Sequence, residues 1–209
     1  MLPALWIARS LNQVRGVMVA GSTALLALSV YLVFAFLDAR ALDPHSEMLF
    51  VSSVEWFPPL HINYTVGVDG ISVAMLLLSA IITFTGTFAS WQLKPLTKEY
   101  FLWFTLLSMG VFGFFITTDM FAMFMFYEIA LIPMYLLIGV WGSGRKEYAA
   151  MKLTLMLMGG SAFLMCGIFG IFYGAGGQTM NIIDIANHTN GAHAIATNWQ
   201  LIWFPMTFV

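Results

Sequence analysis

Charged residues are scarce in this chain. Only 9% of its 209 residues are Asp, Glu, Lys or Arg, compared with roughly a quarter in soluble proteins, whereas 60% are hydrophobic and the mean hydropathy is +0.87. These proportions exclude an ordinary soluble domain and predict an integral membrane protein. The eight Lys and Arg residues and ten acidic residues give a net charge of -2, which excludes the clustered positive charge of a nucleic-acid-binding protein.

The sequence also lacks the usual signatures of metal, nucleotide and nucleophilic chemistry. Cys166 is the single cysteine, so no intrachain disulfide can form. The histidines at positions 45, 61, 188 and 193 have no metal-ligand spacing. No glycine-rich phosphate loop follows a predicted strand, and no nucleophile has an adjacent base and an orienting acid. The sequence therefore predicts no cofactor in this chain.

Long apolar runs are abundant instead. About 20 apolar residues fill a hydrocarbon core of ~30 Å. The segments of that length are 16–37, 70–91, 100–117, 120–141 and 149–173. Another apolar segment begins near Trp199 and has only eleven residues up to Val209, so we expect it to be the start of a sixth helix in a longer polypeptide. The predicted fold is all-α, a polytopic transmembrane helix bundle that forms one partial membrane domain over residues 1–209.

Basic residues alternate between the predicted loops. Counted along the chain, the segments outside the spans carry two, one, two, none, two and no Lys or Arg residues. Because Lys and Arg are retained on the cytoplasmic side, we place the amino terminus, the 92–99 loop and the 142–148 loop in the cytoplasm. The remaining segments are then external.

The external segments contain turn and cap signals. Residues 55–70 predict a short hairpin, and the Gly- and Asn-rich stretch 174–198 predicts an ordered loop with room for one short helix. Asp69 and Asp119 each stand immediately before an apolar run. A short acceptor side chain at that position caps the free N–H groups of a helix, so both are predicted to be N-caps.

Glu128 lies well inside the apolar run 120–141. As the ninth residue of that run it is roughly 12 Å deep, close to the membrane midplane. A carboxylate there costs on the order of 3 kcal/mol, so we expect it to face a bundle interior, a water-filled cavity or a partner. Its own helical stripe offers apolar and aromatic side chains: Phe121, Phe124, Met125, Ile132 and Tyr135. Glu128 is thus either a proton-carrying group or a permanently protonated acid hydrogen-bonded between helices.

Pro133 follows Glu128 by five residues. It has no N–H to donate to the carbonyl of Ile129. The sequence therefore predicts a kinked or loosened turn beside the acid, with a free carbonyl that favours local water.

Lys152 is the one basic residue inside the five complete spans. It lies roughly 6 Å from the cytoplasmic end of its span, whereas Glu128 is about 20 Å from that side. A direct ion pair is therefore not expected, although a chain of waters could join the two. Lys152 is either a proton-translocation residue or a side chain that snorkels to the interface. The partner of Glu128 is expected beyond Val209 or on another subunit.

Three stretches resemble a known family. "GVDGIS" (67–72), "TDMFAMFMFYEIALIPMYLLIGVWG" (118–142) and "YAAMKLTLMLMGGSA" (148–162) are similar to the antiporter-like, proton-pumping membrane subunits of respiratory complex I, the group that includes subunit M of bacterial NADH-quinone oxidoreductase. The resemblance implies two inverted helix repeats, of which this sequence supplies the second to sixth helices and the start of a broken seventh. It also implies that Glu128 pairs with a lysine of that seventh helix, and that Lys152 has a supporting role.

The resemblance further implies a function and partners. The chain would be a translocase subunit of NADH-quinone oxidoreductase that couples quinone reduction elsewhere in the complex to proton transport. NAD, FMN, iron-sulphur clusters and quinone would be held by partner subunits, and this chain would contact other membrane subunits and the lipid of a bacterial inner (plasma) membrane. Two alternatives remain open. One is a subunit of a multisubunit sodium-proton antiporter or an energy-converting hydrogenase; the other is a non-pumping structural fragment.

Overall fold

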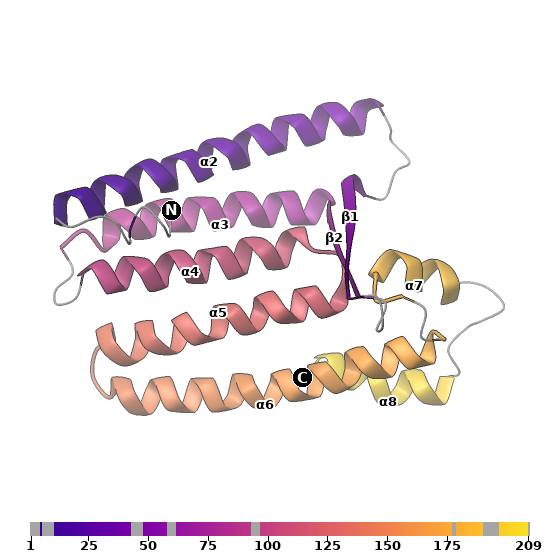
Figure 1. Cartoon of the computed structure of the whole chain (residues 1–209). Helices are drawn as coiled ribbons and strands as arrows, with labels where there is room; N and C mark the ends of the chain where they lie inside the picture. Colours follow the sequence, from indigo (N-terminus) through magenta and orange to yellow (C-terminus); the bar gives the residue numbers. More distant parts are fainter. Residues whose placement is uncertain are drawn as a thin grey trace.

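Five long helices lie side by side in chain order, and consecutive helices are neighbours (Figure 1). In this computed structural model the described residues are 5, 11–42, 48–57, 62–92, 97–176, 179–189 and 197–208. The helices are α2 (Leu11–Leu42), α3 (Gly70–Ala89), α4 (Thr97–Ile116), α5 (Met120–Trp141), α6 (Lys146–Gly174), α7 (Ile182–Thr189) and α8 (Thr197–Phe208). Helices α2 to α6 are each long and apolar enough to cross a bilayer. The predicted polytopic helix bundle is confirmed.

The helix ends differ from the predicted spans where polar residues continue a helix beyond its apolar part. Helix α2 starts five residues before the predicted span 16–37 and ends five residues after it. It therefore includes Arg15 and Arg40 near its two ends. A helix satisfies its own backbone groups, so it can extend into the headgroup region with charged side chains that a hydropathy reading excludes. Helix α5 has the bounds of the predicted run.

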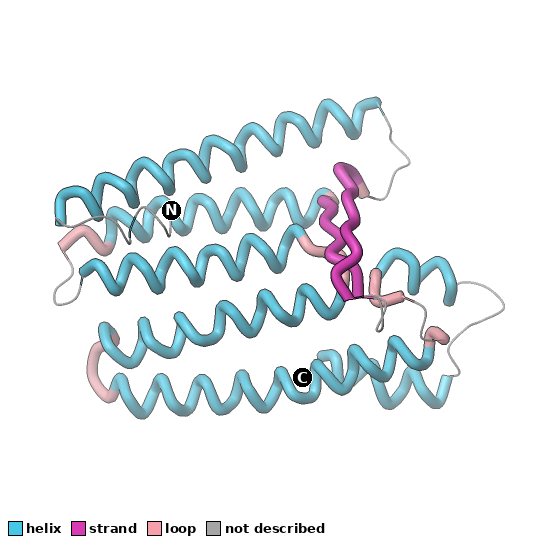
Figure 2. Tube along the Cα trace, in the orientation of Figure 1, coloured by secondary structure: helices cyan, strands magenta, loops and turns pink. Residues whose placement is uncertain are grey.

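A two-stranded antiparallel hairpin joins α2 to α3. Strand β1 (Leu49–Phe57) pairs with β2 (Ile62–Val68), with Val54 opposite Tyr64. Figure 2 shows the hairpin standing across the ends of α3, α4 and α5. The hairpin expected over 55–70 is present, but β1 begins six residues earlier because Leu49 and residues Ser52 to Val54 also pair with the second strand.

Backbone hydrogen bonds tie the hairpin, the α4–α5 turn and the segment before α7 together. The Thr118 amide donates to the Thr65 carbonyl at 3.0 Å, and the Ile182 amide donates to the Thr118 carbonyl at 3.1 Å. The Met120 amide donates to the Met180 carbonyl at 3.0 Å. These bonds satisfy backbone groups at the start of α5 and hold that helix end in place.

Asp69 and Asp119 cap α3 and α5, as the sequence predicts. Asp69 Oδ1 accepts a hydrogen bond from the Ser72 amide at 2.7 Å, and Asp119 Oδ1 accepts from the amides of Phe121 and Ala122 at 3.0 and 3.1 Å. The second oxygen of Asp119 is buried and has no hydrogen-bond partner among the described residues. The side chain of Asp119 is fully buried. The loss of its hydration therefore opposes the stabilisation that its cap hydrogen bonds provide.

The two caps should respond oppositely to removal of charge. Burial raises the pKa of Asp119 by more than the bonds from Ala122 and other backbone amides lower it. Its stabilising contribution is therefore present below the ordinary pKa of 3.8 and is lost as pH rises through the folded-state pKa. Asn keeps the cap without the charge. We expect Asp119→Asn to raise the melting temperature at neutral pH, with a smaller gain in acid, as measured by thermal unfolding in detergent.

Asp69→Asn is the matched control. Burial alone would raise the pKa of Asp69, but hydrogen bonds from the Ser72 hydroxyl and amide outweigh it and the pKa is lowered. That contribution is present above 3.8 and is lost as pH falls. Asp69→Asn should therefore lower the melting temperature at neutral pH. The same sign of change in both variants would contradict this account.

Close helix contacts depend on glycine at two interfaces. A Cβ on Gly110 of α4 would lie 2.9 Å from the Ala130 Cβ of α5, and a Cβ on Gly113 would overlap the Phe126 ring. On α6, Gly167 faces Thr207 of α8 in the same way. Small residues let transmembrane helices approach closely and gain van der Waals contact.

Candidate proton-translocation site

Glu128 is an isolated carboxyl group in the middle of α5. Its side chain is half-buried, and its Oε1 atom is buried without a hydrogen-bond partner. Among the residues that the structure describes, no cation forms an ion pair with it. A buried acceptor without a donor costs on the order of 1–3 kcal/mol, and more when charged. A proton, a water molecule or a cation would remove this cost by satisfying the oxygen.

The stripe of α5 that carries Glu128 is packed against other residues on one side of Glu128 and exposed on the other. Toward the hairpin, Phe121 and Phe124 pack against a cluster on α6 and the α6–α7 connection. Toward Trp141, Ile132 is 58% exposed and Tyr135 is 40% exposed. Glu128 therefore lies at the border between a closed half and an open half of the same helix face. One side seals it with aromatic rings, and the other leaves it accessible.

Pro133 is fully buried inside α5, and the helix is continuous from Met120 to Trp141. The helix is not interrupted at Pro133. The carbonyl of Ile129 nevertheless lacks its intrahelical donor, because proline has no N–H. An acceptor is thus available one residue from Glu128.

Lys152 is exposed and lies on the side of α6 that faces away from α5. Ala150 is 1% exposed and marks the side toward α5, where a Cβ on Gly139 would be 3.7 Å from the Ala150 Cβ. Lys152 follows Ala150 by two residues, which is about 200° around a helix. The structure therefore does not bring Lys152 and Glu128 together.

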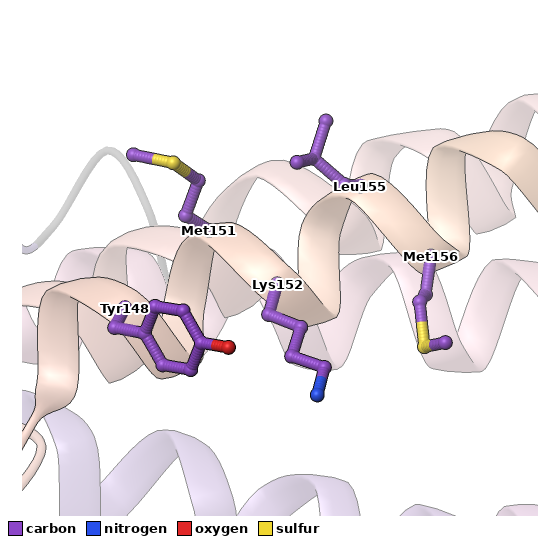
Figure 3. Close-up of a pocket in the computed structure, with 5 residues that line it drawn as sticks. All are labelled: Tyr148, Met151, Lys152, Leu155 and Met156. Carbon is purple, nitrogen blue, oxygen red and sulfur yellow. The ribbon is translucent and has the colours of Figure 1, made fainter.

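Figure 3 shows Lys152 and Met156 extending from one side of the α6 ribbon, with Tyr148 near Lys152, whereas Met151 and Leu155 extend from the opposite side in this view. These five residues line a groove of about 380 Å³. The apolar run in the sequence predicted helix α6, but the sequence did not indicate which side of α6 meets α5.

Two cavities beside α5 were not anticipated from the sequence. The larger, about 710 Å³, lies among α2, α3, α4 and α5; the smaller, about 420 Å³, lies between the hairpin and α5. Tyr64 and Phe126 line both cavities, and their ring centroids are 6.2 Å apart. The smaller cavity also has Glu55 of β1 and Ile129 of α5 in its wall. It thus extends from an acid on the hairpin to the neighbour of Glu128, a relation between distant segments that only the tertiary fold creates.

Only one of the four histidines lies in the part of the chain that the structure describes. His45, His61 and His193 lie outside the described residues, and His188 belongs to α7. Within the described ranges, no group of three or more His, Cys, Asp and Glu side chains is placed to hold a metal ion.

Comparison with known proteins identifies the class to which this arrangement belongs. Residues 117–209 match a family described as "NADH:quinone oxidoreductase/Mrp antiporter, TM". The match starts at the α4–α5 turn and includes Glu128, Pro133 and Lys152. The fold is similar to a chain of "Respiratory complex I from Thermus thermophilus with bound NADH", with a TM-score of 0.77 and 20% identity over 99% of this chain and 40% of that chain.

Curated relatives place the chain more closely. It is 34% identical over 163 residues to "NAD(P)H-quinone oxidoreductase chain 4, chloroplastic" of Chara vulgaris, covering 77% of this chain and 33% of the relative. It is 32% identical over 161 residues to "F(420)H(2) dehydrogenase subunit M" of Methanosarcina mazei, covering 76% and 31%. The chain belongs to the subunit M or chain 4 family of antiporter-like membrane subunits, and the sequence resemblance is confirmed. It spans about a third of the length of these relatives.

Proposed function

We propose that this chain is a proton-translocating membrane subunit of an NADH-quinone oxidoreductase, in which Glu128 holds the proton near the bilayer midplane. The observation that carries this proposal is the buried, unpartnered Oε1 atom of Glu128. Ionisable groups at that depth are expensive and mark ion or proton pathways by default. The proposal also agrees with a multi-pass membrane location, here the plasma membrane of a bacterium with the amino terminus cytoplasmic.

The proposed mechanism has two states of the Glu128 carboxyl. When a cation approaches, the carboxylate is stabilised and the proton leaves; when the cation withdraws, the desolvated carboxylate takes up a proton. The cation is the lysine of the broken seventh helix, which the family resemblance implies beyond Val209. Movement of charge in a neighbouring membrane subunit would drive the change between the states. NAD, FMN, iron-sulphur clusters and quinone would do their redox chemistry in partner subunits.

The smaller cavity supplies a proton path on the hairpin side. Its α5 wall consists of Ala122, Met125, Phe126 and Ile129. Water in this cavity would connect the level of Glu128 with the exposed Glu55 on β1. Tyr64 and Phe126 separate the smaller cavity from the larger one. Protons in the smaller cavity would therefore not pass to the α2 side of the bundle.

Lys152 should act on transport only indirectly. It faces away from α5, and an unpaired charge on the far side of a helix contributes at most about 1 kcal/mol at an effective dielectric constant of about 20. We expect Lys152→Gln to lower the transport rate about fivefold. Lys146→Gln is the control, because its ammonium donates to the Val140 carbonyl at 2.7 Å at the helix end. A loss of more than about a hundredfold in Lys152→Gln would contradict a supporting role.

The function is tested by proton movement in inverted membrane vesicles from cells with and without this chain. NADH oxidation should acidify the vesicle interior only when the chain is present. If acidification follows an imposed sodium gradient and ignores NADH, the sodium-proton antiporter alternative is correct. If acidification is the same with and without the chain, the non-pumping structural alternative is correct.

A further inference from the structure

Asp119 is the one acidic residue that is buried in the described part of the chain. Its Oδ1 atom accepts hydrogen bonds from the amides of Phe121 and Ala122, whereas its Oδ2 atom is buried without a hydrogen-bond partner among the described residues. Burial is the largest influence on the pKa of Asp119 and raises it, against the amides of Ala122, Asn63 and Phe121. An ionised carboxylate would hold charge on an oxygen without a donor, which costs more than the neutral acid does.

Three segments that are distant in the sequence meet around this carboxyl at one end of the bundle (Figure 2). The amide and the hydroxyl of Thr118 both donate to the Thr65 carbonyl of β2, at 3.0 and 3.3 Å. On the other side the Met120 amide donates to the Met180 carbonyl at 3.0 Å, and the backbone of Asp119 forms an antiparallel bridge with that of the next residue, at position 181. We call this meeting point of β2, the α4–α5 turn and the segment before α7 the Asp119 junction. Because the chain's own residues enclose Oδ2, water can reach it only when the junction opens.

No basic side chain of the surrounding elements balances a charge on Asp119. The described residues of the hairpin, α3, α5, the segment before α7 and α7 contain no Lys or Arg. Arg40 is exposed at the end of α2, a helix that packs on α3, α4 and β1. His188, in the last turn of α7, is the one titratable group of these elements that can become cationic. The others can only disfavour a second negative charge, and they are Glu55, Tyr64, Asp69, Tyr127, Glu128, Tyr135 and Asp184.

We propose that the Asp119 carboxyl is a reversible proton-binding site that controls whether this junction is closed. With the proton bound, the neutral acid caps α5 and the three segments pack as the structure shows. Loss of the proton leaves a buried carboxylate without a counter-charge. That carboxylate gains hydration only if the hairpin or the segment before α7 moves away from the start of α5. Proton release is therefore coupled to opening, and proton uptake to closing.

The junction also fixes one end of the smaller cavity. The α5 wall of that cavity begins at Ala122, whose amide bonds to Asp119, and its hairpin wall includes Tyr64, the neighbour of Thr65. Opening of the junction would therefore change access to the cavity from the end of the bundle that carries the hairpin. The pH on that side would control this access. The inference does not depend on proton transfer by Glu128.

The expected pH dependence has a definite direction. The closed junction is fully stabilised below 3.8, the ordinary pKa, and it loses this stabilisation as the pH rises through the raised pKa of buried Asp119. Between these two values the equilibrium constant for opening should rise by up to about tenfold per pH unit. Above the raised pKa it should stay constant.

Hydrogen exchange of the intact complex measures this equilibrium. The amides of Thr118, Met120 and Ile182 bond across the junction, so they exchange only when it opens. In the wild type their protection, corrected for the intrinsic exchange rate at each pH, should be highest in acid and should fall as the pH rises. Protection that stays the same from about pH 4 to about pH 8 would overturn the proposal, and this result needs no variant.

Three variants assign the pH dependence to one carboxyl. Asp119→Asn keeps the cap but cannot release a proton, so protection should be independent of pH and equal to that of the wild type in acid. Asp69→Asn, at the cap of α3, is the matched control and should keep the wild-type profile. Glu128→Gln should also keep it, which separates this proposal from the proposed transport function. A pH dependence that persists in Asp119→Asn, or that is lost in either of the other variants, would overturn the proposal.

Discussion

Replacing Glu128 by Gln is expected to lower proton transport by at least about a hundredfold, because a positioned proton-transfer group contributes on the order of 10²–10⁴ to a rate. Gln has the size of Glu but cannot release or take up a proton. Its amide can donate a hydrogen bond and needs no counter-charge at the midplane, so the variant should insert and assemble normally. The measurement is NADH-driven acidification of vesicles, normalised to the amount of assembled complex.

Two further variants show whether the loss is specific to this position. Glu128→Asp keeps the acid but withdraws it by one methylene, and it should retain part of the rate. Glu147→Gln removes an exposed acid from the first turn of α6 and should leave the rate unchanged. Near-normal transport in Glu128→Gln, or equal losses in the Gln variants at 128 and 147, would contradict a proton-carrying role for Glu128.

Gly113→Ala is expected to cause a large loss of stability at the α4–α5 interface. The added Cβ overlaps the ring of Phe126, which is also held by Tyr64 on the hairpin. Overpacking of this kind costs typically 1–3 kcal/mol. It should also shift the partition between the two cavities, because Gly113 and Phe126 both line the larger one. The measurement is the melting temperature in detergent.

Gly159→Ala provides the matched control. Gly159 lies in the middle of α6, and a Cβ there has no atom within 4 Å. With nothing to overlap, the higher helix propensity of Ala should stabilise the chain by up to about 1 kcal/mol. The two Gly-to-Ala changes should therefore shift the melting temperature in opposite directions. A shift of the same sign would mean that helix propensity, and not the α4–α5 contact, governs both sites.

The spans and caps were predictable because each follows from local physics. A bilayer demands about 20 apolar residues in a self-satisfied helix, so α3, α4 and α5 can be read from hydropathy alone. Asp69 and Asp119 could be recognised because a cap acts within three residues of its own position. The two ends of α2 and the starts of α4 and α6 were missed by several residues, since charged residues continue a helix outside the hydrocarbon core without any change in backbone bonding.

The surroundings of the candidate site could only partly be predicted. Depth, which depends on counting residues, separated Lys152 from Glu128, and the structure adds that Lys152 lies on the side of α6 that faces away from α5. That second fact depends on which side of α6 meets α5, and its all-round apolar sequence does not specify this. Likewise, nothing near Glu55 indicated that it shares a cavity wall with Ile129, because this cavity lies between the hairpin and a residue 74 positions further along the chain.

The central claim, that the Glu128 carboxyl gains and loses a proton during turnover, is tested most directly by infrared difference spectroscopy of the intact complex. The account predicts a carboxylic-acid carbonyl band that changes when NADH is added, shifts in deuterated water and is absent from the Glu128→Gln variant. A spectrum that is identical in the wild type and in Glu128→Gln would show that this carboxyl keeps one protonation state throughout, and would contradict the account.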